Sequence, residues 1–191
     1  SIEPDIEVND RSGMASSTRL KAIDLWQTDI PEGDPEKLAY TLFCVENPPG
    51  NGYVSGSQDS IGIVFPGVNR LDYPAGKYWP ERITSVTGED TLQWIEKRLW
   101  LINLSPRDKN FDVLSDTHIS PEGAKELAGA AESVWKAIMV KDTLLFGKSF
   151  RRSFDAQVAM FPHMVNPAIR QIINEYEDQS VGWKISGAGG G

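Results

Sequence analysis

The stretch Ser12-Gly13-Met14-Ala15-Ser16-Ser17 constrains the rest of the chain most strongly. Alternating apolar residues over 2–8 predict a strand before it, and the apolar spacing over 20–26 predicts a helix after it. A glycine and small hydroxyl residues at a helix N-terminus leave backbone N–H groups unpaired beside the positive end of the helix dipole, which favours phosphate binding. The alternative is a helix cap, in which Ser16 or Ser17 satisfies one free N–H group. On this stretch alone the cap is favoured, so the rest of the chain decides.

Composition narrows the class of protein. The 191 residues are 40% hydrophobic and 24% charged, which is typical of a folded chain with one large domain or two small ones. The net charge of -8 argues against a nucleic-acid partner, and no apolar run is long enough to indicate a membrane-spanning helix. The single cysteine, Cys44, excludes an internal disulfide and a cysteine-rich zinc site, and its apolar neighbours predict a core position. With no visible signal peptide, a reducing, cytoplasmic setting is favoured.

A second helix is predicted from Asp34-Pro35-Glu36, which combines an N-cap, a proline at the first helical position and an acidic first turn. It ends at Glu46, before the breaker at 47–52. The helix dipole disfavours a carboxylate at this end, although an exposed surface glutamate is the ordinary interpretation.

A second loop of small residues, 55–60, enters a short apolar helix. It places Asp59 in or near the first helical turn, where an aspartate is usually a cap. Residues 68–73 alternate like a strand. The aromatic segment 76–82 is irregular, and it fits a pocket wall and the edge of a core equally well.

In the second half, helices are predicted over 90–98, from 120, over 143–160 and over 167–176, and strands over 99–104 and 181–185. The first of these strands reads as a central one that is buried on both sides. The boundary of a second lobe is placed near residue 97. The cluster Lys148, Arg151 and Arg152 is interpreted as a solvated helix face rather than a substrate clamp. The last strand runs into glycines at 186–191, which allow close approach to a ligand or form a flexible tail.

Taken together and in order, three stretches resemble the motifs of the GHMP kinases, the family of galactokinase, homoserine kinase, mevalonate kinase and phosphomevalonate kinase. Residues 12–17 resemble the phosphate-binding motif P-x-x-x-G-L-G-S-S, with Met14 for leucine and Ala15 for the second glycine. Residues 56–59 resemble the G-x-x-D-Q segment, with Ser60 where glutamine is common. Residues 184–191 are similar to K-x-[ST]-G-[AS]-G-G-G. The wider text is most similar to bacterial fucokinase-type and heptose-kinase-type members.

The resemblance implies an α+β, two-lobed GHMP kinase fold. Residues 1–96 would form an incomplete N-terminal, ATP-binding lobe, and residues 97–191 a ferredoxin-like C-terminal lobe. The family's first motif, with any basic partner of the catalytic aspartate, would lie before residue 1, so we expect little catalysis from these 191 residues alone.

The resemblance also implies the chemistry: an ATP- and Mg²⁺-dependent kinase that phosphorylates a sugar, at its anomeric hydroxyl, with fucose or a heptose phosphate as the leading acceptors. Asp59 would be catalytic, and Ser17 and Glu46 would hold Mg²⁺. A non-sugar alcohol as acceptor and a non-catalytic nucleotide- or sugar-binding regulator stay open, as does the oligomeric state. The ATP-binding residues would be Ser12, Gly13, Met14, Ala15, Ser16, Ser17, Gly187, Ala188, Gly189 and Gly190.

Overall fold

The computed structural model describes residues 15–27, 29–102, 104, 112, 115–187 and 189. Within these residues the fold is α+β: helices dominate, and one small sheet is present. The contacts divide the described chain between Leu92 and Gln93 into two compact units, each of which is described by itself. The predicted boundary, between residues 96 and 97, lies a few residues further along. None of the helices that the structure describes has the length and apolar character needed to cross a membrane.

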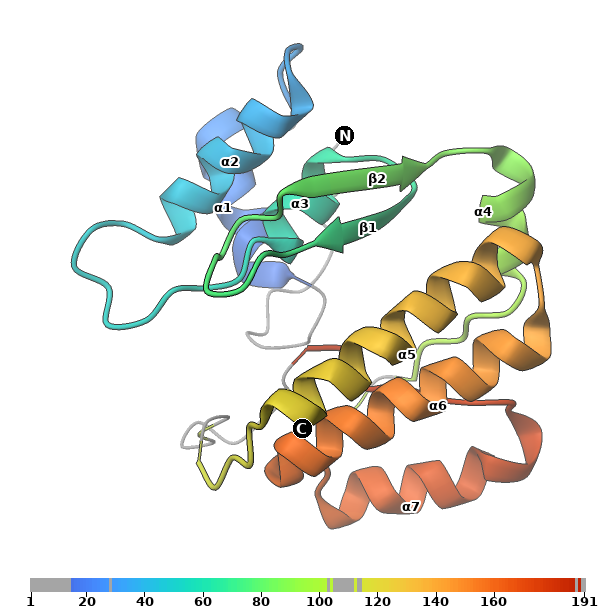
Figure 1. The fold of residues 1–191 in the computed structure, drawn as a ribbon. Helices are drawn as coiled ribbons and strands as arrows, with labels where there is room; N and C mark the ends of the chain where they lie inside the picture. Colours follow the sequence, from blue (N-terminus) through green and yellow to red (C-terminus); the bar gives the residue numbers. More distant parts are fainter. Residues whose placement is uncertain are drawn as a thin grey trace. The chain divides into compact units, whose positions relative to one another are not determined.

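Three helices form the first unit: α1 (Ser16–Trp26), α2 (Pro35–Glu46) and α3 (Gln58–Val64). The predicted start of α2 is confirmed, because the Asp34 side chain accepts a hydrogen bond of 3.0 Å from the Glu36 backbone N–H and Pro35 fills the first position. Helices α1 and α2 lie side by side (Figure 1). Their fully buried Ala22 and Leu42 form a small core. Packed against this pair are Ile23, Trp26, Ile30 and Ile63.

The sheet of this unit is an antiparallel hairpin of β1 (Val68–Asp72) and β2 (Arg82–Val86). The first strand was predicted and the second was not, because 82–86 has little apolar alternation. Asp72 faces Arg82 across the ladder and accepts from its Nε at 2.9 Å. Gly67 enters the hairpin with φ of +80°, and a Cβ there would lie 2.2 Å from the carbonyl oxygen of Val86, so this position requires glycine.

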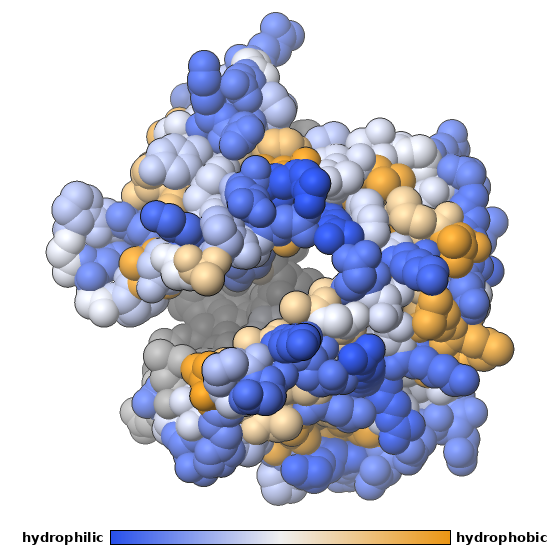
Figure 2. Space-filling model, in the orientation of Figure 1, coloured by the Kyte–Doolittle hydropathy of each residue, from blue (hydrophilic) through white to orange (hydrophobic). Residues whose placement is uncertain are grey.

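Helix α4 (Glu89–Glu96) crosses the division, and the second unit continues with α5 (Pro121–Val140), α6 (Thr143–Met160) and α7 (Pro167–Tyr176). Short 3-10 turns cover Pro162–Met164 and Glu177–Gln179. Helices α5 and α6 form a hairpin (Figure 1), and the predicted helices over these segments are confirmed. Ser120, Asp142 and Asn166 cap the starts of α5, α6 and α7 with their side chains. Hydrophilic residues cover most of the face of α5 and α6 seen in Figure 2.

The core of the second unit lies between α6, α7 and the C-terminal segment. Phe154 of α6 and Ile169 of α7 pack with Ile185. The same cluster contains Met164, Val165 and, at its margin, Leu104, Val158, Phe161, Ile173 and Trp183. Trp183 and Ile185 of the segment 181–185 therefore pack into this core, and the segment is not paired in a sheet.

Both strands predicted for the second half are wrong in the described residues. Residues 99–102 form no ladder, and Trp100 is 90% exposed. Residues 181–185 form none either, because Gly182 lies directly against the backbone of Gly147, where a Cβ would come within 2.0 Å of the Gly147 carbonyl oxygen. An apolar run alone does not specify a strand, since a strand needs a partner for its backbone hydrogen bonds. The ferredoxin-like sheet is accordingly not formed among the described residues of this unit.

Candidate functional site

The candidate site lies in the first unit, where the start of α1, the end of α2 and the start of α3 meet. Thr18 in α1 donates a buried hydrogen bond of 2.5 Å from Oγ1 to Oε1 of Glu46, the last residue of α2. Asp59 in the first turn of α3 is near enough for its negative charge to raise the pKa of Glu46. Two carboxylates and a hydroxyl from three helices are thus brought together.

The start of α1 has an unusual backbone. Ala15, at the N-cap, is left-handed, with φ of 55° and ψ of 31°, and it offers no side-chain cap. Glycine adopts this conformation readily and alanine does not, so the position at which the family motif has its second glycine is the position that needs one. Ser16 begins α1, and Ser17 is exposed in the first turn. Of the predicted phosphate loop, residues 12–14 lie outside the described residues.

Glu46 is not the exposed surface glutamate of the ordinary interpretation. Its side chain is buried, with 5% exposure, and Oε2 has no hydrogen-bond partner among the described residues. Burial raises the pKa of Glu46 and Asp59 adds to this effect, while the hydrogen bond from Thr18 and the charge of Lys21 oppose it. Its hydroxyl partner is Thr18, which the sequence analysis missed by naming the exposed Ser17 one residue earlier. The helical period held the missing signal, since Thr18 shares the buried face of α1 with Ala22.

Asn47 fixes the loop between the two carboxylates. Its Nδ2 donates to the carbonyl oxygens of Phe43, at 2.9 Å, and Ser55, at 3.3 Å, and its Oδ1 accepts from the Ser55 N–H at 2.7 Å. Asn51 donates to the carbonyl oxygen of Glu46 at 3.4 Å. The loop that leads to Asp59 is therefore fastened to the end of α2.

Asp59 is half-buried and is not the cap of α3. The N-cap is Ser57, and the Asp59 side chain makes no hydrogen bond with any described residue. Burial raises the pKa of Asp59 above its ordinary value. A half-buried carboxylate that makes no hydrogen bond with the described residues, and whose charge acts on the buried Glu46, is suited to accept a proton from a ligand.

Ser57 connects this helix start to the hairpin. It is fully buried, and its Oγ donates to the carbonyl oxygen of Tyr78 at 2.6 Å and lies 2.9 Å from the Tyr73 hydroxyl. A serine hydroxyl has one proton, so the Tyr73 hydroxyl is the donor in the second bond. Burial raises the pKa of Tyr73, the hydrogen bond with Ser57 opposes this, and the charge of Asp59 raises it further, so Asp59 is near enough for its charge to act on the phenol. Neither Ser57 nor Tyr73 is predicted as a site residue from the sequence.

The aromatic segment 76–82, which fitted a pocket wall and a core edge equally, lines a pocket of about 430 Å³ in the first unit. Trp79 packs edge-on against Tyr40 of α2, with ring centres 5.0 Å apart. Cys44 also lines the pocket and is exposed, so its predicted core position is wrong. The buried face of α2 carries Ala39, Leu42 and Glu46, and Cys44 lies outside that stripe.

The closing glycines belong to the second unit. Gly187 and Gly189 both have φ of 69°, and Gly189 is buried, where a Cβ would lie 2.5 Å from the carbonyl oxygen of Met164. This packing argues against a free flexible tail at Gly189. Lys184, at the start of the same motif, donates to Gln157 Oε1 at 2.5 Å, and burial lowers its pKa. Ala188 and Gly190 lie outside the described residues.

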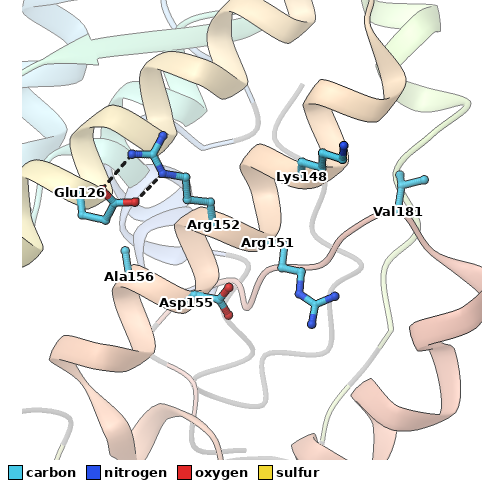
Figure 3. A pocket seen from close by; sticks show the side chains of 7 residues that line it. All are labelled: Glu126, Lys148, Arg151, Arg152, Asp155, Ala156 and Val181. Carbon is cyan, nitrogen blue, oxygen red and sulfur yellow. Dashed lines mark hydrogen bonds and ion pairs between the residues drawn. The ribbon is translucent and has the colours of Figure 1, made fainter.

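The basic cluster of α6 lines a second pocket, of about 650 Å³ (Figure 3). Arg152 points toward Glu126 and binds both of its carboxylate oxygens, whereas Arg151 points away, pairs with Glu177 at 3.3 Å and covers the Trp183 ring at 4.3 Å. Two of the three cations are thus paired with carboxylates, which favours a structural role over a substrate clamp.

Two further observations concern metal binding and similarity to known proteins. In the described part of the chain, no three His, Cys, Asp or Glu side chains are grouped as a metal site built from protein ligands alone would require. Comparisons of the chain with models of protein families, with curated proteins and with solved structures find no significant match.

Proposed function

We propose that this chain is part of an ATP- and Mg²⁺-dependent kinase of the GHMP type that transfers the γ-phosphoryl group to a hydroxyl of a sugar. The observation that carries the proposal is the meeting of Thr18, Glu46 and Asp59 at three helix ends. Thr18 directly follows the stretch that resembles the family's phosphate-binding motif, Asp59 belongs to the stretch that resembles its catalytic segment, and Glu46 ends the helix between them. A capping role accounts for neither Glu46 nor Asp59.

The residues at the end of α2 fit a magnesium ion. Oε2 of Glu46 is a buried carboxylate oxygen without a partner among the described residues, and Thr18 brings a hydroxyl to the same carboxylate. Magnesium in nucleotide sites is held by one or two protein oxygens together with phosphate oxygens and water, so a larger cluster of acidic residues is not needed. Thr18 and Glu46 would hold the ion, with Ser17 as the neighbouring hydroxyl. When bound, the ion would neutralise charge on the transferred phosphate.

Asp59 is suited to the proton step. Its raised pKa strengthens it as a base, and its side chain is not engaged by other described residues. The acceptor hydroxyl oxygen forms a bond to the γ-phosphorus, the bond from that phosphorus to the bridging oxygen of ADP breaks, and the hydroxyl proton passes to Asp59. The backbone N–H groups at the start of α1, which has no side-chain cap at Ala15, would bind the phosphates.

The test is an assay of ADP release by the full-length protein with ATP, Mg²⁺ and a panel of sugars. Asp59→Asn should lower kcat about 100-fold or more while ATP still binds. Asp24→Asn, which changes an exposed aspartate of α1, is the matched control and should leave kcat unchanged. Turnover with mevalonate or homoserine but with no sugar would mean that the acceptor is a non-sugar alcohol.

The alternative from another class is a non-catalytic nucleotide- or sugar-binding regulator. The departures at Met14, Ala15 and Ser60 from the family motifs favour it. A regulator would bind ATP or a sugar without releasing ADP, and it would keep its function in Asp59→Asn. The same variant therefore separates the two classes.

A further inference from the structure

We propose that Tyr73 binds a second hydroxyl of the acceptor, next to the hydroxyl that Asp59 activates, and so restricts the site to polyhydroxylated acceptors. The inference rests on the proposed function and deepens it, because it assigns to Tyr73 the selection of a sugar over an acceptor that has only one hydroxyl.

The single hydroxyl proton of Ser57 decides the direction of its hydrogen bond with Tyr73. That proton is donated to the carbonyl oxygen of Tyr78, at 2.6 Å, so the Tyr73 hydroxyl must donate to Ser57 across the 2.9 Å contact. The Tyr73 proton is then committed, and its oxygen keeps a lone pair that no described residue uses. Tyr73 can therefore accept a hydrogen bond from a ligand hydroxyl, and its own orientation is already fixed.

The position of Tyr73 is set by hydrogen bonds in the hairpin and to the start of α3. It follows the last residue of β1, Asp72, whose carbonyl oxygen accepts from the Glu81 N–H at 2.9 Å. Ser57, which holds the phenol oxygen, is the N-cap of α3, and Asp59 is two residues further on in the same first turn. The phenol and the carboxylate are thus attached to the same helix start, one through a hydrogen bond and one directly.

Tyr73 is also accessible, since 42% of it is exposed, and Asp59 is only half-buried. Both oxygens act as acceptors, so a ligand that uses both must bring two hydroxyl donors. A sugar supplies neighbouring hydroxyls, whereas an acceptor with one hydroxyl leaves the lone pair of the Tyr73 oxygen unused. Burial, and to a lesser extent the charge of Asp59, raise the pKa of Tyr73, which keeps the phenol neutral and able to donate to Ser57.

The experiment compares Tyr73→Phe with wild type in the full-length protein, using the best sugar acceptor and its monodeoxy derivatives. Tyr73→Phe should lower kcat/KM for the sugar about 10-fold, which corresponds to one lost hydrogen bond, and should leave the KM for ATP unchanged. One deoxy sugar, which lacks the contacted hydroxyl, should be equally poor with both proteins. Tyr53→Phe, at a tyrosine that is 73% exposed, is the matched control and should change nothing.

Equal losses with every deoxy sugar, or no loss at all, would overturn the inference, because a merely structural role would not single out one hydroxyl. If wild type transfers no phosphoryl group, calorimetric titration with the same sugars decides. If sugar binding weakens about 10-fold in Tyr73→Phe, the role of Tyr73 in sugar binding stands and the proposed kinase activity is wrong. If no sugar binds, both the role of Tyr73 and the kinase activity are wrong.

Discussion

Thr18 and Glu46, 28 residues apart in the sequence, share a buried hydrogen bond of 2.5 Å that joins the start of α1 to the end of α2. A carboxylate is disfavoured at a helix C-terminus and again by burial. The fold therefore keeps Glu46 in an unfavourable position and supplies only one partner among the described residues, the Thr18 hydroxyl. Such an arrangement is typical of a site whose remaining partner is a ligand.

Thr18→Val tests the contribution of this hydroxyl to stability. The substitution keeps the side-chain shape and removes the donor, which leaves Glu46 buried with neither oxygen paired among the described residues. We expect the free energy of unfolding at neutral pH to fall by about 1–3 kcal/mol in urea denaturation. Ser17→Ala, at the exposed neighbour, is the control and should stay within about 0.5 kcal/mol of wild type. A Thr18→Val protein as stable as that control would show that the bond contributes nothing.

The pH dependence of stability follows from the two raised pKa values. The ordinary values are 4.5 for Glu46 and 3.8 for Asp59, and both are higher in the folded state. Above the ordinary value the folded state holds more protons than the unfolded state, so the free energy of unfolding falls as pH rises through the folded pKa. Urea denaturation in the presence of a chelator should show this fall, and Glu46→Gln should reduce it.

Asp72 provides the internal control for that experiment. Hydrogen bonds from Arg70 and Arg82 lower its pKa below the ordinary value of 3.8, so its contribution is present above that value and is lost as pH falls. Asp72→Asn should therefore reduce the loss of stability in acid and leave the fall at higher pH in place. A Glu46→Gln profile parallel to wild type would contradict the raised pKa of Glu46.

Ala15→Gly should stabilise the first unit, an unusual result for a change to glycine. Ala15 has φ of 55°, where the Cβ of an L-residue is strained by about 1–2 kcal/mol, and glycine removes that strain at a smaller entropic loss. We expect a gain of about 0.5–1 kcal/mol in the free energy of unfolding. Ala22→Gly in the buried middle of α1 should instead destabilise by about 1 kcal/mol or more. A loss of stability in Ala15→Gly would show that the left-handed backbone is not retained in solution.

The sequence was most informative where a local rule operates. A capping side chain followed by proline defines the starts of α2 and α5, so Asp34-Pro35 and Ser120-Pro121 were sufficient. The prediction of a strand over 99–104 is wrong because it rests on apolar character alone, whereas strand formation depends on a partner elsewhere in the chain. The second strand of the hairpin was not predicted because its own apolar alternation is weak. Its pairing with β1, rather than its own sequence pattern, makes it a strand.

The candidate site, too, depends partly on local sequence patterns and partly on contacts between distant elements. Asp59 was named from the segment that resembles a family motif and Glu46 from its place at the end of a helix, but the burial of Glu46 and its pairing with Thr18 depend on how α1 packs on α2. Local sequence patterns do not predict that Tyr73 belongs to the site, because only the fold of the hairpin brings it to Ser57, 16 residues earlier. Contacts between elements, rather than residue types, decide which hydroxyls belong to the site.

Gly189→Ala and Gly76→Ala separate backbone strain from packing at the closing glycines. The two glycines have nearly equal φ, 69° and 70°, so alanine strains the backbone similarly at both. At Gly76 no atom lies within 4 Å of the added Cβ, whereas at Gly189 the Met164 carbonyl oxygen would be 2.5 Å away. We expect a loss of about 1 kcal/mol for Gly76→Ala and at least about 2 kcal/mol for Gly189→Ala, measured by urea denaturation. Equal losses would mean that Gly189 is not packed on Met164, and no loss in Gly189→Ala would mean that its backbone is free, as in a flexible tail.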